Sequence, residues 1–400
     1  MIETRPYKLI NQIQNYSWGT KNESAFIPQL IGFNPLPNNP YAELWMGAHK
    51  SASSKIIVGD RELFLSDAIE KYPNQILGKS VVEKFGKTLP FLFKVLSAGE
   101  PLSIQAHPNK RQARVLHKRD PVNYPDENHK PEIAVAIDKL EALVGFRPLQ
   151  EILDEINSSK ALQLFFNNAL NLELNSRETS IKILYEAALD NYFKKSSSFN
   201  ELIDNLNKEL LSKGNEISDR EKLFVEMFSK YNYDVGLISI FFLNLIHLEK
   251  GEGVFLDAGI PHAYLKGNIV ECMANSDNVV RAGLTPKFTD IESLKEIINF
   301  DSQELLKFHF EDNSMGRKYN APVEEFAIEK VMLKNGNTRQ IISNDKPSVI
   351  LVIEGEGHIF FNENQKVIMT KGESFLLPAV LTKTNIEAIT TLEFFHSTVP

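Results

Sequence analysis

The spacing of hydrophobic residues changes along the chain and divides it into regions of different type. From residue 7 to about 145, short apolar runs alternate with turn residues, as at 89–95 and 133–137. This pattern is typical of antiparallel strands, and the stretches 65–72 and 109–119 predict helices between them. The region therefore predicts a β unit that contains short helices.

Between about 149 and 245 the pattern changes sharply. Glycine nearly vanishes, and Leu, Ile and Phe recur at intervals of three and four residues, which is the period of an amphipathic helix. Ser198 with Glu201, and Ser218 with Glu221, have the spacing of helix capping boxes. We expect several short helices here, inserted into one β domain because strands resume after them.

Short apolar runs broken by Gly, Pro and Asn resume at 251–287. Within this segment, Gly251, Asp257, Gly259 and His262 have a spacing that is similar to the second metal-binding motif of cupin jelly rolls. Asp257 stands where that motif usually has proline. His262 is thus a candidate metal ligand on the rim of a strand.

After about residue 310 the chain returns to strands. Gly372 and Pro378 repeat the cupin spacing, but Lys383 occupies the position of the metal-binding histidine, which predicts a second jelly roll without metal. The fold is therefore predicted to be mainly β with a helical insert, as two cupin-type jelly rolls plus an α-helical domain. The expected parts are a catalytic domain in two segments (1–148 and 246–315), a helical insert (149–245) and a metal-free C-terminal domain (316–400).

Composition and charge narrow the possible partners. The chain has 400 residues and a net charge of −8 without a basic run, which argues against nucleic acid but leaves room for a small anion in a locally positive pocket. No segment reaches the roughly 18 apolar residues of a membrane helix, and no signal peptide is evident. The single cysteine, Cys272, fits a reducing compartment. We expect a cytoplasmic monomer that binds neither nucleic acid nor membrane.

Gln105 and His107 form the first candidate constellation, in the stretch S-I-Q-A-H-P. Residues two apart on a strand point to the same face, and Pro108 ends the strand directly after them. Both side chains could therefore reach one ion. The alternative is that His107 is a hydrogen-bonded structural or surface residue, which is the commoner role of a lone histidine in a strand.

Glu132 follows Pro131 and leads into the apolar strand I-A-V-A-I. A carboxylate that enters a buried strand is costly unless it is paired or coordinated. The alternative is a solvated strand end. His129 is a rival ligand, but it lies in a polar loop, and we interpret it as structural or as part of the substrate's surroundings.

Taken together, Gln105, His107, Glu132 and His262 offer two imidazoles, one carboxylate and one amide oxygen. This mixture suits Zn²⁺ better than Mg²⁺ or Ca²⁺, which prefer oxygen ligands only. Iron, manganese and cobalt remain alternatives. Cys272 is interpreted as a small buried hydrophobic residue.

Positive side chains accompany these segments. Lys130, Arg281 and Lys287, together with Ser103 beside the Gln105 strand, suit a substrate that carries a phosphate. The alternative for each cation is a surface ion pair. No Walker loop and no G-x-G-x-x-G motif supports nucleotide binding.

Two stretches, Y-P-D-E-N-H-K-P-E and H-A-Y-L-K-G-N-I-V-E-C-M-A-N-S-D-N-V-V-R-A-G-L-T-P-K, resemble the signatures of type I mannose-6-phosphate isomerases. N-Y-S-W-G, A-E-L-W-M-G-A-H and S-I-Q-A-H-P add to the resemblance. It covers about 1–147 and 235–320 well, whereas the helical insert and the C-terminal part agree in texture and position more than in motif.

The resemblance implies an enzyme with one zinc per chain that interconverts mannose 6-phosphate and fructose 6-phosphate. Gln105, His107, Glu132 and His262 match the family's metal ligands, and Arg281 matches its essential arginine. Four further residues fall in its active-site strands: Ser103, Lys130, Glu271 and Lys287. In an aldose–ketose isomerisation, Glu271, Lys130 and zinc-bound water compete as the general base.

Two alternatives of other classes are a non-catalytic sugar-phosphate-binding regulator and a cupin oxygenase or epimerase. The intact ligand set with Arg281 and Lys130 argues against the regulator. Oxygenase chemistry requires redox-active iron, so full activity with zinc alone would exclude the oxygenase.

Overall fold

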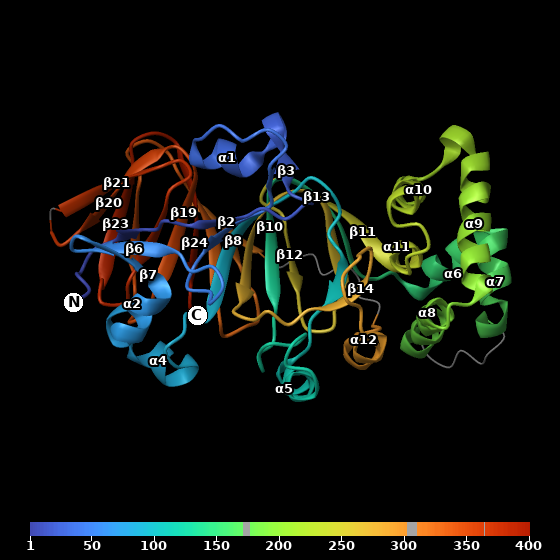
Figure 1. The fold of residues 1–400 in the computed structure, drawn as a ribbon. Coiled ribbons are helices and arrows are strands. Elements are labelled where there is room, and N and C mark those ends of the chain that lie inside the picture. The colour runs from blue at the N-terminus through green and yellow to red at the C-terminus, as the bar shows by residue number, and fades with distance from the viewer. Residues whose placement is uncertain (171–176, 302–309, 364) are drawn as a thin grey trace.

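The computed structural model describes residues 1–170, 177–301, 310–363 and 365–400. Figure 1 shows the helical region at one end of the molecule, the C-terminal strands at the other, and a large sheet between them. None of the helices in the described ranges combines the length and apolar character that a membrane span requires.

The strands are β1 Tyr7–Lys8, β2 Gln12–Gln14, β3 Thr20–Lys21, β4 Pro40–Tyr41, β5 Glu43–Met46, β6 Lys55–Val58, β7 Arg61–Phe64, β8 Phe91–Ala98, β9 Ile104–Ala106, β10 Glu132–Phe146, β11 Leu243–Leu248, β12 Gly253–Leu256, β13 His262–Ala274, β14 Val280–Gly283, β15 Phe310–Asn313, β16 Gly316–Tyr319, β17 Ala327–Leu333, β18 Thr338–Ile342, β19 Ser348–Glu354, β20 Glu356–Phe361, β21 Gln365–Thr370, β22 Ser374–Leu377, β23 Lys383–Ala388 and β24 Leu392–Thr398. The helices are α1 Phe26–Ile31, α2 Leu65–Lys71, α3 Pro73–Ile76, α4 Lys79–Phe85, α5 Lys110–Arg119, α6 Leu149–Ser158, α7 Lys160–Leu170, α8 Arg177–Phe193, α9 Ser197–Ser212, α10 Asp219–Tyr231, α11 Gly236–Phe242 and α12 Ile291–Ile297, with short 3₁₀ turns at Asn22–Ser24 and Gly214–Glu216.

The central sheet has the order β11-β10-β13-β8-β5-β2, with β12, β9 and β14 attached at its side. Its middle strand β8 is buried along its whole length. Because side chains alternate between the two faces of a strand, Phe93 and Val95 point into an apolar core while Lys94, between them, lines a cavity on the other face. The same alternation along β5, β10 and β13 places polar side chains on the face of the sheet that lines the cavity and apolar side chains on the face that forms the core.

The C-terminal strands cover the apolar face of this sheet. Phe93, Val135 and Val270 of the central sheet share a core with Val349 and Leu351 of β19. A separate core lies inside the C-terminal strands, between the sheet that contains β19 and the four-stranded sheet β18-β23-β20-β21. The chain start also joins this end of the molecule, because β1 pairs with β22 in antiparallel register.

The helical region forms a core of its own that also contacts the central β region. Phe166, Phe199 and Phe224 from the insert share this core with Phe146 of β10. Ser218 and Glu221 form the predicted capping box at the start of α10. The predicted box of Ser198 and Glu201 is wrong. Ser196 caps α9 by accepting a hydrogen bond from the Ser198 N–H, because the helix starts two residues earlier than a cap at Ser198 implies.

A mainly β chain with a helical region in its middle is therefore confirmed, and α2 and α5 lie where helices are predicted at 65–72 and 109–119. The domain limits stay a prediction, at 1–148, 149–245, 246–315 and 316–400.

Glu325 connects the segment before β17 to two parts of the chain that precede the helical region. Its carboxylate is buried and lies 2.8 Å from Lys110 Nζ of α5 and 2.8 Å from His129 Nε2. Burial alone would raise the pKa of Glu325, but the hydrogen bonds from His129 and Lys110 lower it from 4.5 to about 2. The C-terminal part thus holds the loop that leads into β10.

We expect Glu325→Gln to lower the free energy of unfolding at pH 7 by about 2 kcal/mol, because charge-assisted hydrogen bonds are lost. Since the folded pKa is depressed, the stabilisation is complete above about pH 4.5 and is lost as the pH falls towards 2. Urea unfolding at several pH values measures this loss of stability. The control Glu324→Gln removes an exposed ion pair with Lys84 and should change stability by less than about 0.5 kcal/mol. Equal losses in the two variants would contradict this account.

Candidate active site

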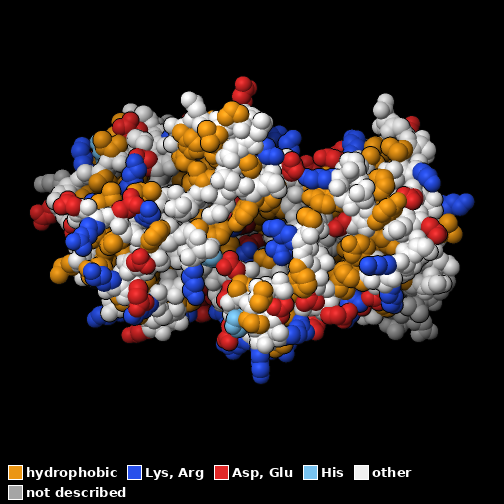
Figure 2. Space-filling model, viewed as in Figure 1, with side chains coloured by type: hydrophobic (Ala, Val, Ile, Leu, Met, Phe, Trp, Pro, Cys, Tyr) orange, Lys and Arg blue, Asp and Glu red, His pale blue; other side chains and the backbone are white. Residues whose placement is uncertain are grey.

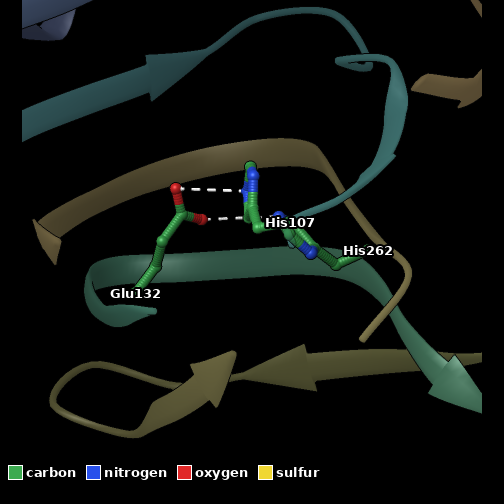
Figure 3. Close-up of side chains that lie close together, drawn as sticks. All are labelled: His107, Glu132 and His262. Carbon is green, nitrogen blue, oxygen red and sulfur yellow. Dashed lines mark ion pairs between the residues drawn. The ribbon is translucent and has the colours of Figure 1, made fainter. Parts of the chain in front are cut away.

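Three strand ends bring the predicted ligands together. Gln105 lies in β9 with His107 just beyond it, Glu132 opens β10, and His262 opens β13. Gln105 is paired in register with both His262 and Arg281. Residues separated by more than 150 positions therefore meet at one place (Figure 3).

His107, Glu132 and His262 are all buried, and their ligand atoms lie within 4.8 Å of one another. The two carboxylate oxygens of Glu132 each face one imidazole, with Oε1 3.4 Å from His107 Nε2 and Oε2 3.4 Å from His262 Nε2. Figure 3 shows both imidazoles turned towards the carboxylate. Each ring donates its Nδ1–H to a backbone carbonyl, that of Asn278 (2.8 Å) for His107 and that of Ile260 (2.9 Å) for His262.

This arrangement fits a metal ion. Within the described ranges, the buried atoms His107 Nε2 and Glu132 Oε2 have no hydrogen-bond partner, which would be costly if nothing were bound between them. Burial lowers the pKa of His107 to about 4, so its imidazole is neutral at pH 7 and keeps the lone pair that a metal needs. Gln105 Nε2 lies 3.3 Å from His262 Nε2, so a half-turn of this amide presents its oxygen to the same place.

Outer hydrogen bonds hold the metal-facing side chains. Asn278, whose carbonyl fixes His107, is fully buried and donates from Nδ2 to the carbonyls of Asp126 (2.7 Å) and Asn128 (2.9 Å). Asp126 in turn accepts from Ser276 Oγ and the Asp277 N–H, each at 2.8 Å. These hydrogen bonds thus join the two sequence signatures to each other. Hydrogen-bond partners outside the ligand set orient histidine ligands in this way.

The cluster opens into a cavity of about 670 Å³ whose walls include Gln105 and Glu132. Figure 2 shows basic side chains beside a hollow near the middle of one face of the molecule. Among the sequence-predicted residues, the cavity wall includes Ser103, Lys130, Glu271, Arg281 and Lys287. The sequence prediction and the cavity therefore agree on position.

Glu271 is held by two partners. Tyr264 donates its hydroxyl to Oε1 at 3.0 Å, and Lys94 forms an ion pair with Oε2. Lys94 also lies 3.5 Å from Glu43, whose carboxylate accepts from Trp45 Nε1. Burial raises the pKa of Glu271 above its usual range. Burial also disfavours the charge of Lys94, but the neighbouring carboxylates of Glu271 and Glu43 outweigh this and raise the pKa of Lys94.

The sequence analysis missed Lys94, Tyr264 and Glu43. The available signal was Lys94 itself, a charged residue at the centre of the apolar stretch F-L-F-K-V-L-S-A. A charge at such a position predicts either an edge strand or a functional pair, and here β8 is a central strand.

The cations of the cavity fall into two groups. Lys130 Nζ lies 2.9 Å from Glu132 Oε1, and Lys230 at the mouth pairs with Glu100. In contrast, Arg281 and Lys287 have no carboxylate partner within the part of the chain that the structure describes. Two unpaired cations in one cavity are suited to an anionic ligand.

His129, the rival ligand, lies outside the cluster. It pairs with Glu325 and is absent from the group of residues that could hold a metal. Its interpretation as a structural residue is consistent with this contact.

Comparison with known proteins identifies the family. Residues 7–149 match the model for the catalytic domain of type I phosphomannose isomerase, and residues 316–397 match the cupin domain of mannose-6-phosphate isomerase. Mannose-6-phosphate isomerase 2 of Arabidopsis thaliana is 37% identical over 394 residues, which cover 92% of this chain and 87% of the relative. The chain belongs to the type I phosphomannose isomerase family. The predicted C-terminal cupin domain is thereby confirmed.

Further relatives extend the agreement over the whole fold of this phosphomannose isomerase family member. Mannose-6-phosphate isomerase of Homo sapiens is 35% identical over 376 residues, which cover 89% of each chain. A crystal structure of a variant phosphomannose isomerase from Salmonella typhimurium superposes with a TM-score of 0.87 at 31% identity, covering 98% of this chain and 99% of the other. A structure of mannose 6-phosphate isomerase bound with zinc and yttrium gives 0.85 at 31% identity with the same coverage.

We expect His262→Ala to lose bound zinc, because one imidazole and the orienting contact with Gln105 disappear. Removal of a direct ligand should weaken zinc binding by more than the roughly 10–100-fold that loss of an outer partner costs. Elemental analysis and competition with a chelator measure this. The matched control His129→Gln removes the other candidate histidine and should retain one zinc per chain. Stoichiometric zinc in His262→Ala would show that the cluster is not the metal site.

Proposed function

We propose that this family member interconverts mannose 6-phosphate and fructose 6-phosphate in the 670 Å³ cavity, with one zinc held by Gln105, His107, Glu132 and His262. The observation that carries the proposal is that a buried His–Glu–His cluster adjoins a cavity with two cations, Arg281 and Lys287, that have no carboxylate partner among the described residues. The relatives named mannose-6-phosphate isomerase support the choice of substrate.

The phosphate is proposed to bind towards Lys287 and Ser103, while the sugar carbons lie towards the metal cluster. Arg281 lies between these regions, because its strand position is opposite the metal-facing Gln105. Its planar guanidinium can therefore reach an oxygen next to the reacting carbons, whereas Lys287 lies six residues further along at the cavity wall.

The reaction moves a proton between C2 and C1 of the open-chain sugar through an enediol or enediolate. Zinc, when bound, acts as a Lewis acid that polarises the carbonyl and hydroxyl oxygens. The protein supplies fixed positive charge around the developing negative oxygen from Arg281, Lys130 and Lys94. Preorganised charges of this kind stabilise a transition state without reorganisation during the reaction.

Glu271 is proposed as the proton acceptor. Tyr264 and Lys94 fix its orientation, and burial raises its pKa, which strengthens it as a base relative to an exposed carboxylate. Lys130 is a poorer candidate because its ammonium is engaged with Glu132. Of the two side chains that compete as the base, the contacts thus favour Glu271, and zinc-bound water stays the alternative.

A coupled assay with mannose 6-phosphate tests the function. Purified protein should produce fructose 6-phosphate, lose this activity after metal removal by a chelator, and regain it with zinc alone. Substrate binding without turnover in the zinc-loaded protein would instead indicate the sugar-phosphate-binding regulator. Activity that required iron and oxygen would indicate an oxygenase.

We expect Arg281→Lys to lower kcat by about 10²–10³ with little change in KM, because the planar fork that stabilises the transition state is lost while a positive charge remains. Steady-state kinetics and zinc content of the same preparation measure this. A large rise in KM at unchanged kcat would instead make Arg281 a phosphate anchor.

We expect Glu271→Gln to lower kcat by about 10²–10⁴, because the amide keeps the shape of the side chain but cannot accept the proton. Glu100→Gln is the matched control, since Glu100 lies at the cavity mouth and pairs with Lys230 away from the metal cluster. A kcat within tenfold of the wild type in Glu271→Gln would assign the base elsewhere.

A further inference from the structure

The link between helices α10 and α11 of the helical region reaches back to the wall of the substrate cavity. Asp234 in this link accepts hydrogen bonds at Oδ1 from the backbone N–H of Gly236 (2.6 Å) and from that of Leu284 (2.6 Å). The N–H of Thr285 is a third donor to the same carboxylate. The bond to Gly236 is a local turn contact, but the other two cross 50 residues of sequence.

Leu284 has an unusual backbone conformation at this contact. Its φ is +51°, a left-handed conformation that is unfavourable for a residue with a Cβ atom and that its surroundings must impose. The carboxylate of Asp234 supplies such a constraint, because charge-assisted hydrogen bonds to the N–H groups of Leu284 and Thr285 favour this one geometry.

The two backbones also touch directly. A Cβ atom added to Gly236 would lie 2.6 Å from Leu284 N, and one added to Gly283 would lie 2.4 Å from Gly236 N. Neither position has room for a side chain, so both glycines are needed for the approach. The contact is therefore a close and specific junction between the helical region and the end of β14.

The residues on both sides of this junction line the cavity. Arg281 precedes it in β14, and Leu284, Thr285, Pro286 and Lys287 follow it. The junction thus lies between the two cations that have no carboxylate partner in the described residues. Because a displacement of about 1 Å at a binding group can cost up to 10²-fold in rate, the backbone path here matters for the ligand.

We propose that Asp234 is a positioning residue for the anion-binding part of the substrate site. It fixes the left-handed turn at Leu284 and so directs Arg281 and Lys287 into the cavity from opposite sides of the junction. The helical region thereby contributes to substrate binding, although Asp234 itself does not touch the substrate. The identity of the anion as a sugar phosphate rests on the proposed function.

Three variants of the full-length, zinc-loaded protein test this role. Asp234→Ala removes the acceptor, Asp234→Asn retains an oxygen in the same place, and Asp204→Ala is a matched control. Asp204 lies in α9 of the same helical region and accepts an exposed hydrogen bond from Tyr233, so Asp204→Ala removes a contact of the same link while the acceptor of the Leu284 N–H is kept.

The first measurement is hydrogen–deuterium exchange of the peptide that contains residues 283–287, which requires no catalytic activity. We expect faster exchange in Asp234→Ala, near wild-type exchange in Asp234→Asn, and no change in Asp204→Ala. The second measurement is steady-state kinetics with mannose 6-phosphate. We expect KM to rise about tenfold or more in Asp234→Ala and to stay within about threefold in Asp234→Asn, with zinc content unchanged in both.

Unchanged exchange and unchanged KM in Asp234→Ala would overturn the proposal, as would an equal rise of KM in Asp204→Ala, which would indicate general loosening of the insert. If the wild-type protein has no isomerase activity while Asp234→Ala still exchanges faster at 283–287, the proposed function fails and the positioning role stands.

Discussion

The buried carboxylate of Glu132 is the constraint on which the catalytic region depends. A charge in a protein interior costs several kcal/mol unless it is paired and hydrogen-bonded. Here Lys130 lies 2.9 Å from one oxygen, and the two imidazoles of His107 and His262 face the carboxylate. Burial raises the pKa of Glu132, but the positive charge of Lys130 together with the contacts from His107 and His262 holds this pKa well below its usual range. The site is thus charged and oriented, as a metal requires.

The alternation of side chains along β8, β10 and β13 produces the two layers that surround this site. On one face, Lys94 and Glu271 meet opposite each other in register and line the cavity. On the other face, Phe93 and Val270 form a core with the C-terminal cupin domain. An apolar face of this size would be a liability in water, so the C-terminal cupin domain completes the central sheet by covering it. Its Glu325 also reaches the loop that carries His129.

The helical region completes the opposite side of the cavity. Its Lys230 pairs with Glu100 at the mouth, and Tyr231 is part of the wall. The cavity is therefore built from both β segments and from the insert between them. The insert interrupts the β domain in sequence but joins it in space, because β11 pairs with β10 directly after the last helix.

The sequence by itself determined the local features of this protein. The helical period at 149–245 predicts the insert, the two-residue spacing of Gln105 and His107 predicts a shared orientation, and Glu132 at the start of an apolar strand predicts a buried charge. Only the tertiary structure decided the register in which these residues meet, which cavity cations have no carboxylate partner among the described residues, and that Lys94 belongs to the cavity. The physical reason is that periodicity and spacing report the face of an element on which a side chain lies. Proximity instead depends on the register between strands such as β8 and β13, which are distant in sequence, and that register is set by packing of the whole sheet.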